Sequence, residues 1–272
     1  MVTQDVRPRP PRRAWTEVIT GLPISIHLRG AEAAEPGAAA AVAHAFAALR
    51  EADRMFSPYR ADSVLRRLAG GEIDLTATPA DFRTVLALAE HARDRTAGAF
   101  DVRASRWLDP SGIVKGWAAE RASRLLPADS YLNAGGDLAI RSPAEPWRIG
   151  IEHPADPTGL LTVLRVRNGG VATSGSVHRG PHIIDPTTGA AASGIQQATV
   201  IGPSLTWADI WATAIVAAGN RALDAGSALI TRCLSDGYDA LLVSDDGSTW
   251  ITAGFGTHIA PDTPAPPARP LD

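Results

Sequence analysis

Apolar and polar positions alternate near the start of the chain and then change to a helical period. The stretch Ile19–Leu28 alternates and predicts a strand. From Pro36 an alanine-rich amphipathic pattern runs to about Met55 and predicts a helix, with proline in its first turn. The chain therefore opens with a strand followed by a long helix.

The next hundred residues predict two further helices and a short strand. Asp62 is placed to cap a short helix, and Pro79 to open a longer one. The segment Ala99–Val102 has strand character and leads into a glycine-containing turn at 109–116.

The second half alternates between short strands and longer apolar runs. Strands are predicted at 131–133, 138–140, 148–151, 161–166, 241–243 and 250–251, and helices at 205–218 and 221–234. This layout predicts an α+β fold in which antiparallel sheets pack with helices, and it leaves room for two related halves.

Composition sets the domain organisation. The chain has 272 residues, 45% of them hydrophobic, which suffices for a substantial core. Arginine and proline dominate residues 1–13, and proline recurs in residues 258–272. We therefore expect a disordered N-terminal arm over 1–13, a single domain over 14–257 and a disordered tail over 258–272.

Charge and cysteine usage exclude several classes of function. The net charge of -3 provides no field that would attract nucleic acid. Cys233 is the only cysteine, which excludes a disulfide framework and a cysteine-rich zinc site. The N-terminal sequence lacks the apolar core of a signal peptide, and no apolar run is long enough to span a membrane. We expect a cytoplasmic protein without membrane insertion.

Lys115 is the only lysine among 26 basic side chains. It follows Asp109-Pro110, which can cap and begin a helix whose N-terminal amides favour an anion. A compact ammonium beside such a turn indicates a phosphate or carboxylate ligand. The alternative is one lysine that remained by chance in an arginine-rich chain.

Glycines in the segment Asn133–Asp137 could bring backbone amides close to a bound group, or could simply form a bulge or tight turn. The G-x-G-x-x-G spacing is absent, which argues against a dinucleotide-binding fold of the Rossmann type.

Hydroxyl groups, an imidazole and a carboxylate follow in Ala172–Gly175 and His182–Gly189. These groups suit phosphate contacts and proton transfer, although a histidine beside isoleucines is often structural. His178 and Arg179 compete for the same roles. Ser174 lacks the G-x-S-x-G setting of a serine nucleophile.

Asp209 and Thr213 lie four residues apart, on one face of a predicted apolar helix. Their oxygens are hard ligands suited to Mg²⁺. The alternative is a surface pair in which the threonine bonds to its own helix.

Taken together and in order, these motifs resemble the ApbE family of FAD:protein FMN transferases. The resemblance extends from about Thr20 to Ala218. It rests on M-F-S-P-Y, G-A-F-D, D-P-S-G-I-V-K-G, N-A-G-G-D, A-T-S-G followed by H-I-I-D-P-T-T-G, and A-D-I-W-A-T-A.

The resemblance implies an α+β enzyme that uses Mg²⁺, cleaves FAD between its phosphates, and joins FMN to a threonine or serine hydroxyl of an acceptor protein with release of AMP. Similar proteins hydrolyse FAD to FMN and AMP, and a non-catalytic FAD-binding protein or a structural domain are further alternatives. By position, the metal ligands would be the Gly112 carbonyl, Asp209 and Thr213.

By the same resemblance, His182 would activate the acceptor hydroxyl. The residues expected to contact FAD are Thr20, Tyr59, Ser63, Ala99, Phe100, Asp101, Asp109, Lys115, Thr173, Ser174, His182 and Ile183.

The chain departs from the family pattern at two places. Thr20-Gly21-Leu22 stands where the family usually has Met-Gly-Thr, which puts contacts there in doubt. The interval from Asp101 to Asp109 is short and would open one wall of the flavin pocket. Because many relatives are exported lipoproteins, the missing export signal leads us to expect an acceptor that is cytoplasmic or faces the cytoplasm.

Overall fold

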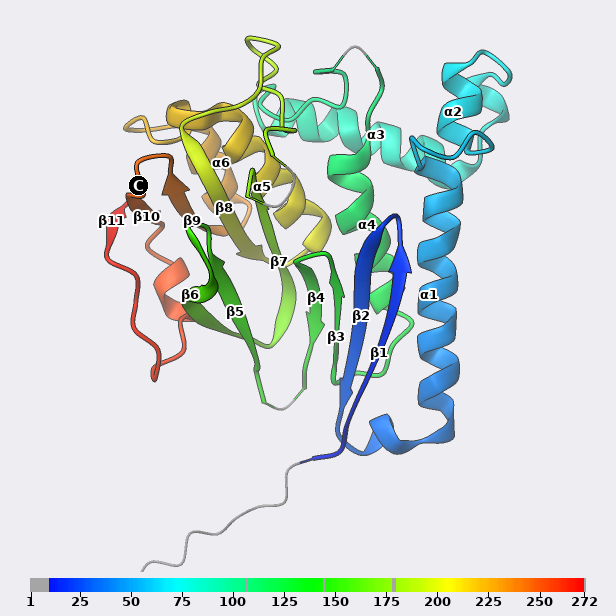
Figure 1. Ribbon diagram of the computed structural model, residues 1–272, viewed down its shortest axis with the longest axis horizontal. Helices are drawn as coiled ribbons and strands as arrows, with labels where there is room; N and C mark the ends of the chain where they lie inside the picture. The colour runs from blue at the N-terminus through cyan, green and yellow to red at the C-terminus, as the bar shows by residue number, and fades with distance from the viewer. Residues whose placement is uncertain (1–9, 106, 144, 178–179, 272) are drawn as a thin grey trace, which may run out of the picture.

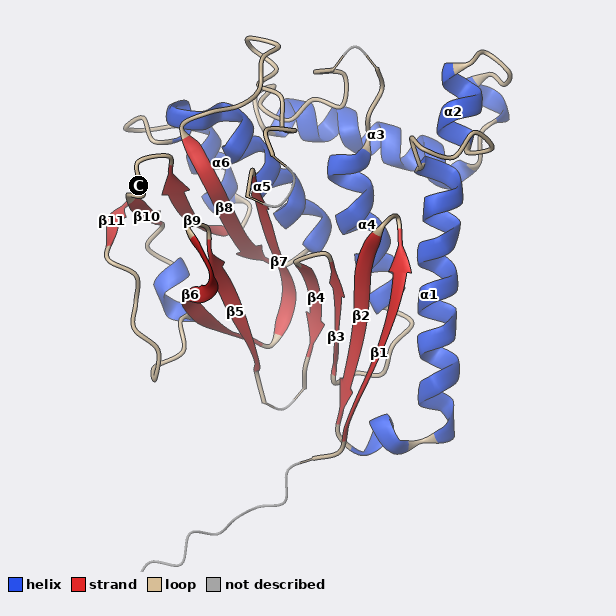
Figure 2. Cartoon of the chain, in the orientation of Figure 1, coloured by secondary structure: helices blue, strands red, loops and turns tan. Residues whose placement is uncertain are grey.

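The computed structural model describes residues 10–105, 107–143, 145–177 and 180–271. Within these residues a nine-stranded sheet has helices on one face, as Figures 1 and 2 show. The strands lie in the order β1 (Arg12–Ile19), β2 (Leu22–Arg29), β3 (Ser130–Ala134), β4 (Asp137–Arg141), β7 (Asn168–Gly175), β8 (Ile195–Gly202), β9 (Asp239–Ser244), β10 (Thr249–Ile251) and β11 (Ala268–Pro270). Neighbours run antiparallel from β1 to β10, which confirms the predicted α+β class.

The strand predicted at 19–28 corresponds to β2, which forms a hairpin with the preceding strand β1. Thr20 and Gly21 have φ angles of 56° and 75° and form a two-residue turn between β1 and β2. Such left-handed conformations suit tight hairpin turns, and threonine seldom adopts them. β1 starts at Arg12, so residues 12 and 13 of the arm expected to be disordered lie in a strand, and residues 1–9 lie outside the described part of the chain.

The helices confirm the strongest sequence signals. The α-helices are α1 (Pro36–Phe56), α2 (Val64–Ala69), α3 (Ala80–Arg95), α4 (Ser111–Ser123), α5 (Leu205–Ala218) and α6 (Ala228–Ser235). Single turns of 3-10 helix occur at η1 (Ala31–Ala34), η2 (Leu75–Ala77), η3 (Gly219–Ala222) and η4 (Phe255–His258). No helix in the described ranges is both long and apolar enough to cross a bilayer.

Three helix starts differ from the prediction. α4 begins at Ser111 with Pro110, and not Asp109, at its N-cap, although Asp109 accepts the Ser111 N–H at 3.0 Å. Ser63, and not Asp62, caps α2, because its hydroxyl accepts the Arg66 N–H at 3.1 Å. The helix expected from Arg221 begins only at Ala228, after η3. A polar residue near the expected start is thus not sufficient to begin a helix there.

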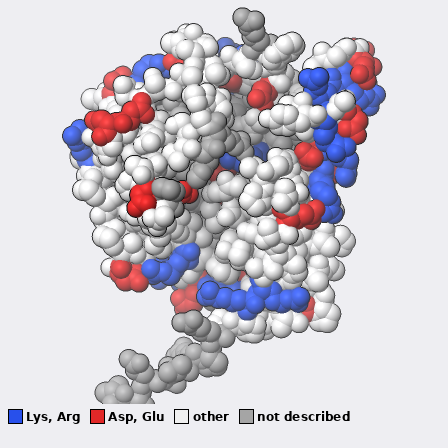
Figure 3. All heavy atoms as spheres, in the orientation of Figure 1, with Lys and Arg blue, Asp and Glu red and all other residues white. Residues whose placement is uncertain are grey.

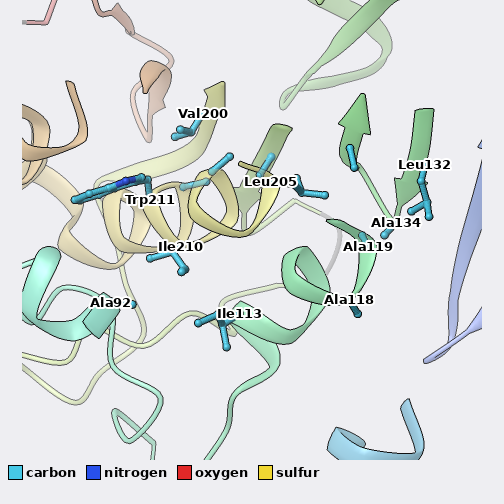
Figure 4. Close-up of a cluster of buried hydrophobic side chains, with 14 of the residues drawn as sticks. Ala92, Ile113, Ala118, Ala119, Leu132, Ala134, Val200, Leu205, Ile210 and Trp211 are labelled. Carbon is cyan, nitrogen blue, oxygen red and sulfur yellow. The ribbon is translucent and has the colours of Figure 1, made fainter. Parts of the chain in front are cut away.

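Apolar side chains form a cluster on each face of the sheet. The first lies between the sheet and α1, α4 and α5; Figure 4 shows Ile113, Leu205 and Trp211 within it. The second lies under the separate hairpin of β5 (Trp147–His153) and β6 (Asp156–Val166). The sheet is therefore covered on both faces, and α4 and α5 pack together on the helical one.

Two segments differ from the expected secondary structure. Residues 99–102 form turns and bends after α3, and not a strand, because the Phe100 N–H donates to the Thr96 hydroxyl at 2.9 Å. The proline-rich end is ordered where it is described: β11 pairs in parallel with β10, and Leu271 is buried. The tail expected to be disordered therefore adds an edge strand.

Candidate active site

Helices α4 and α5 enclose a polar cavity together with the end of β7. Its volume is ≈ 150 Å³, and Figure 3 shows the surface hollowed near the middle of the face in view. Most of the predicted site residues line it: Ala99, Phe100, Asp101, Asp109, Gly112, Lys115, Ser174, His182, Ile183, Asp209 and Thr213. Segments far apart in the sequence thus meet at one site.

Asp209 is fixed by the close approach of α4 to α5. The Gly116 N–H donates to Asp209 Oδ2 at 3.0 Å. The rest of α5 is mostly apolar and buried, and Asp209 is only 1% exposed. A carboxylate buried in this way needs partners, and the Gly116 amide is one of them.

Two hydroxyl groups lie beside this carboxylate. Thr213 is one helical turn beyond Asp209, and its Oγ1 is 3.0 Å from Ser174 Oγ on β7. A Cβ built on Gly112 would lie 3.7 Å from Thr213 Cγ2, so the backbone of α4 is in contact range of the same threonine. Gly112, Asp209 and Thr213, expected as ligands, therefore line a common wall.

The charges around Lys115 are arranged asymmetrically. Its Nζ lies 2.5 Å from Asp137 Oδ2 and 3.8 Å from Asp209 Oδ1. Burial and the neighbouring Asp137 raise the pKa of Asp209 to about 8, against the opposing effect of Lys115. Burial and Asp137 therefore oppose ionisation of Asp209, whereas Lys115 favours it.

The donor set fits a hard divalent cation. One carboxylate, two hydroxyls and a nearby main-chain segment supply oxygens, which Mg²⁺ prefers. Among the described residues no group of three His, Cys, Asp or Glu side chains is arranged for a metal. A cation here would therefore depend on Asp209 together with neutral oxygens and groups of a bound substrate.

His182 lies on an exposed loop at the rim of the cavity. Its Nδ1 is 2.9 Å from the Gly180 carbonyl. A carbonyl only accepts hydrogen bonds, so Nδ1 carries the proton and Nε2 of the neutral ring is left as an acceptor. His178 and Arg179, the competing candidates, lie outside the described residues.

An ion pair holds the same loop. Arg221 donates to both oxygens of Asp185, at 3.0 and 2.8 Å. Hydrogen bonds from Arg221 hold the pKa of Asp185 below its usual value. Asp185, expected as a site carboxylate, instead anchors the loop that presents His182.

A larger, more apolar pocket of ≈ 620 Å³ adjoins the polar cavity. Asp109, Ser111, Lys115 and His182 line both. Thr20 and Tyr59 belong to this second pocket, together with apolar side chains of β1, β2 and α1. The two spaces form a continuous site with a polar end and an apolar end.

Two predicted contact residues do not line either pocket. Ser63 is fully buried, and its hydroxyl donates to the Ser57 carbonyl at 2.7 Å. Thr173 lies in β7, and its hydroxyl is 2.9 Å from that of Thr199 on β8. Ser63 thus shapes the loop before α2, and Thr173 faces away from α5, because side chains alternate along a strand.

Asp137 was missed as a site residue. The N-A-G-G-D motif suggests a source of backbone amides, whereas in the structure the carboxylate of Asp137 in this motif is the partner of Lys115. The sequence does contain a signal for this role: Asp137 is a charged residue directly after a glycine turn, at the start of an apolar strand. A carboxylate that is buried at such a position needs a partner of opposite charge or a hydrogen-bond donor.

Comparison with known proteins identifies a family. The model of the ApbE family matches residues 20–107 and 103–242. A FAD:protein FMN transferase from Salmonella typhimurium is 28% identical over 176 residues, which is 57% of this chain and 49% of that protein. A protein of the same name from Rhodobacter capsulatus is 30% identical over 187 residues, 62% of this chain and 34% of that protein. The matches thus span about half of the first relative and a third of the second.

Solved structures share the fold. An ApbE protein from Thermotoga maritima has a TM-score of 0.79 at 21% identity, covering 92% of this chain and 100% of that one. The flavin transferase ApbE from Vibrio cholerae has a TM-score of 0.77 at 20% identity, covering 92% and 99%. Nearly the whole architecture is therefore common to these proteins.

Proposed function

The chain belongs to the ApbE family, and from that premise we propose that it is a Mg²⁺-dependent FAD:protein FMN transferase. It cleaves the diphosphate of FAD, joins FMN through a phosphoester to a threonine or serine hydroxyl of an acceptor protein, and releases AMP. The observation that carries the proposal is the meeting of Asp209, Lys115 and His182 in one cavity beside an apolar pocket.

The polar cavity is suited to the FAD diphosphate. Lys115 lies on its wall, and the first turn of α4 contributes Ser111 and Gly112. An ammonium and a helix N-terminus both favour negative charge. These groups bind and orient the phosphates, which is the main requirement of phosphoryl transfer.

The metal site consists of Asp209, Thr213 and the Gly112 carbonyl, with the Ser174 hydroxyl beside Thr213. When bound, Mg²⁺ would neutralise negative charge on the phosphate oxygens. Gly116 holds Asp209 in place for this role through its amide hydrogen bond.

His182 is the general base of the proposal. With Nδ1 donating to the Gly180 carbonyl, Nε2 can accept the proton of the attacking hydroxyl. The oxygen of that hydroxyl attacks the FMN phosphorus and the bond to the AMP phosphate breaks, so AMP leaves. His182 is exposed, which lets the hydroxyl arrive on another macromolecule.

The apolar pocket accommodates a ring system of FAD. Phe56 and Ile24 line it, and Tyr59, 93% exposed, stands at its edge. An aromatic face at the opening can stack on a flavin or adenine ring. Of the described residues between Asp101 and Asp109, several border the polar cavity and only Asp109 lines the apolar pocket.

A direct assay distinguishes transfer from the alternatives. Purified protein is incubated with FAD and Mg²⁺, with and without candidate acceptor proteins encoded beside its gene, and AMP and covalently bound flavin are measured. AMP release together with flavin on the acceptor supports transfer. AMP without acceptor indicates FAD hydrolysis, and FAD binding without AMP in any mixture overturns both catalytic functions. A reaction with EDTA tests the metal requirement.

A further inference from the structure

Asp137 connects two walls of the active site. It is fully buried at the first position of β4. Its Oδ2 lies 2.5 Å from Lys115 Nζ on α4, and its Oδ1 accepts the Thr173 N–H of β7 at 3.1 Å. One carboxylate thus joins the helix that carries the ammonium to the strand that carries Ser174.

The turn before β4 places this carboxylate. Gly135 and Gly136 have φ angles of 62° and 104°, and the Asn133 side chain accepts the Gly136 N–H at 2.8 Å. The turn pairs Ala134 with Asp137, so both side chains lie on the same face of the sheet. Ala134 belongs to the apolar cluster on the helical face, which explains why Asp137 faces α4.

The two distances to Lys115 suggest what Asp137 contributes. The ammonium stands on a flexible stem with several rotamers. It is 1.3 Å closer to Asp137 than to Asp209, from the distances of 2.5 and 3.8 Å. Without the charge of Asp137, the ammonium would be drawn to Asp209, whose oxygens the proposed metal requires.

We propose that Asp137 is a positioning residue that holds Lys115 away from Asp209, so that Asp209 can bind the cation while the ammonium faces the FAD phosphates. This inference rests on the proposed transferase function. In this role Asp137 acts through Lys115, beside the direct effect of its charge on the pKa of Asp209.

Asp137→Asn tests the inference with little change in shape, because the amide oxygen can still accept the Thr173 N–H. We expect Mg²⁺ affinity, measured by calorimetry on the FAD-loaded protein, to fall about 10-fold, which is typical of coupling between contacting residues. The titrations are run well above pH 8, where Asp209 is ionised in both proteins, so that the effect of Asp137 on the pKa of Asp209 does not enter the comparison. Asp239→Asn is the control, since Asp239 is a partly buried carboxylate of β9 bonded to Thr252 and lines neither pocket.

A double-mutant cycle with Lys115→Met separates positioning from a structural role. If Asp137 acts through Lys115, Asp137→Asn should change Mg²⁺ affinity by less than about 3-fold in the Lys115→Met background. An equal loss in both backgrounds would overturn the inference. If Asp137→Asn does not fold, Asp137→Ser keeps a hydroxyl acceptor for the Thr173 amide and enters the same cycle.

The double-mutant cycle measures Mg²⁺ binding and not catalysis. A failure of the positioning role can therefore be distinguished from a failure of the proposed transferase function. A wild-type protein that binds FAD and Mg²⁺ without releasing AMP would contradict transfer and leave the coupling measurable. A wild-type protein that transfers FMN, with additive effects of the two substitutions, would leave transfer intact and disprove the positioning role.

Discussion

Gly116 and Asp209 are in direct contact across the interface between α4 and α5. The Gly116 amide donates to Asp209 Oδ2 at 3.0 Å, and a Cβ built on Gly116 would lie 2.9 Å from the Asp209 Cβ. Only a residue without a side chain permits this approach. The position of the carboxylate in the cavity therefore depends on a glycine in the neighbouring helix.

Gly116→Ala should displace Asp209 and damage the site. The added methyl group would also lie 3.1 Å from the Leu205 carbonyl oxygen, so both helices must shift. We expect a loss of about 1–3 kcal/mol in the free energy of unfolding, which is typical of overpacking, and at least a 10-fold lower rate of AMP release.

Gly37→Ala in α1 is the matched control for that substitution. No atom lies within 4 Å of a Cβ built on Gly37. This change should leave activity unaltered and stabilise the helix by up to about 1 kcal/mol. Equal activity of Gly116→Ala and wild type would show that the contact does not position Asp209. Thermal unfolding and the AMP assay provide both readouts.

Replacing His182 by glutamine should remove the base and retain FAD binding. The loss of a general base lowers turnover by about 10²- to 10⁴-fold, while the dissociation constant for FAD, measured by flavin fluorescence, should change little. His44→Gln, on the exposed side of α1, is the control. A wild-type transfer rate in His182→Gln would exclude His182 as the base.

Mg²⁺ binding should weaken as the pH falls below 8. The pKa of Asp209 is raised to about 8 in the metal-free protein by burial and by Asp137, so a proton must leave before the cation binds. Apparent affinity should fall by up to about 10-fold per pH unit between pH 8 and pH 6, as release of one proton requires. Calorimetric titrations at several pH values measure this slope.

The same group should make the metal-free protein less stable as the pH rises. A carboxyl whose folded pKa exceeds its unfolded value contributes stability at low pH and loses it as the pH rises through the folded value, here about 8. The Tm in EDTA should therefore decline from pH 5 to pH 8.5, and less so for Asp209→Asn. An identical pH dependence in the two proteins would contradict the raised pKa.

Arg221→Gln should loosen the loop that carries His182. The bidentate pair with Asp185 is lost, and we expect about a 3- to 10-fold lower kcat, because a misplaced base is less effective. Since Arg221 is partly exposed, the loss in stability should stay near or below about 1 kcal/mol.

The pH dependence of this substitution provides an internal check. The folded pKa of Asp185 lies below its usual 3.8, so the pair stabilises the fold above that pH and ceases to do so as the pH falls through the folded value. The difference in Tm between wild type and Arg221→Gln should be present at pH 6 and vanish in acid. Arg221→Lys keeps the charge without the paired hydrogen bonds and should recover only part of the rate.

The sequence by itself determined the features that depend on neighbouring residues. The apolar periods of α1 and α5 predicted their starts, because a helix is built from contacts three and four residues apart. The order of the short motifs predicted the family, the α+β class and most of the residues that line the cavity.

Only the tertiary structure decided which side chains face the site. Thr173 and Ser174 are adjacent in the sequence, yet only Ser174 faces α5, because pairing with β8 sets the register of β7. Asp137 meets Lys115, and β11 joins β10, through contacts between segments distant in the chain. Local sequence patterns do not predict such pairings. The hydrogen bonds between strands and the burial of charged side chains are determined only when the sheet and the helices pack together.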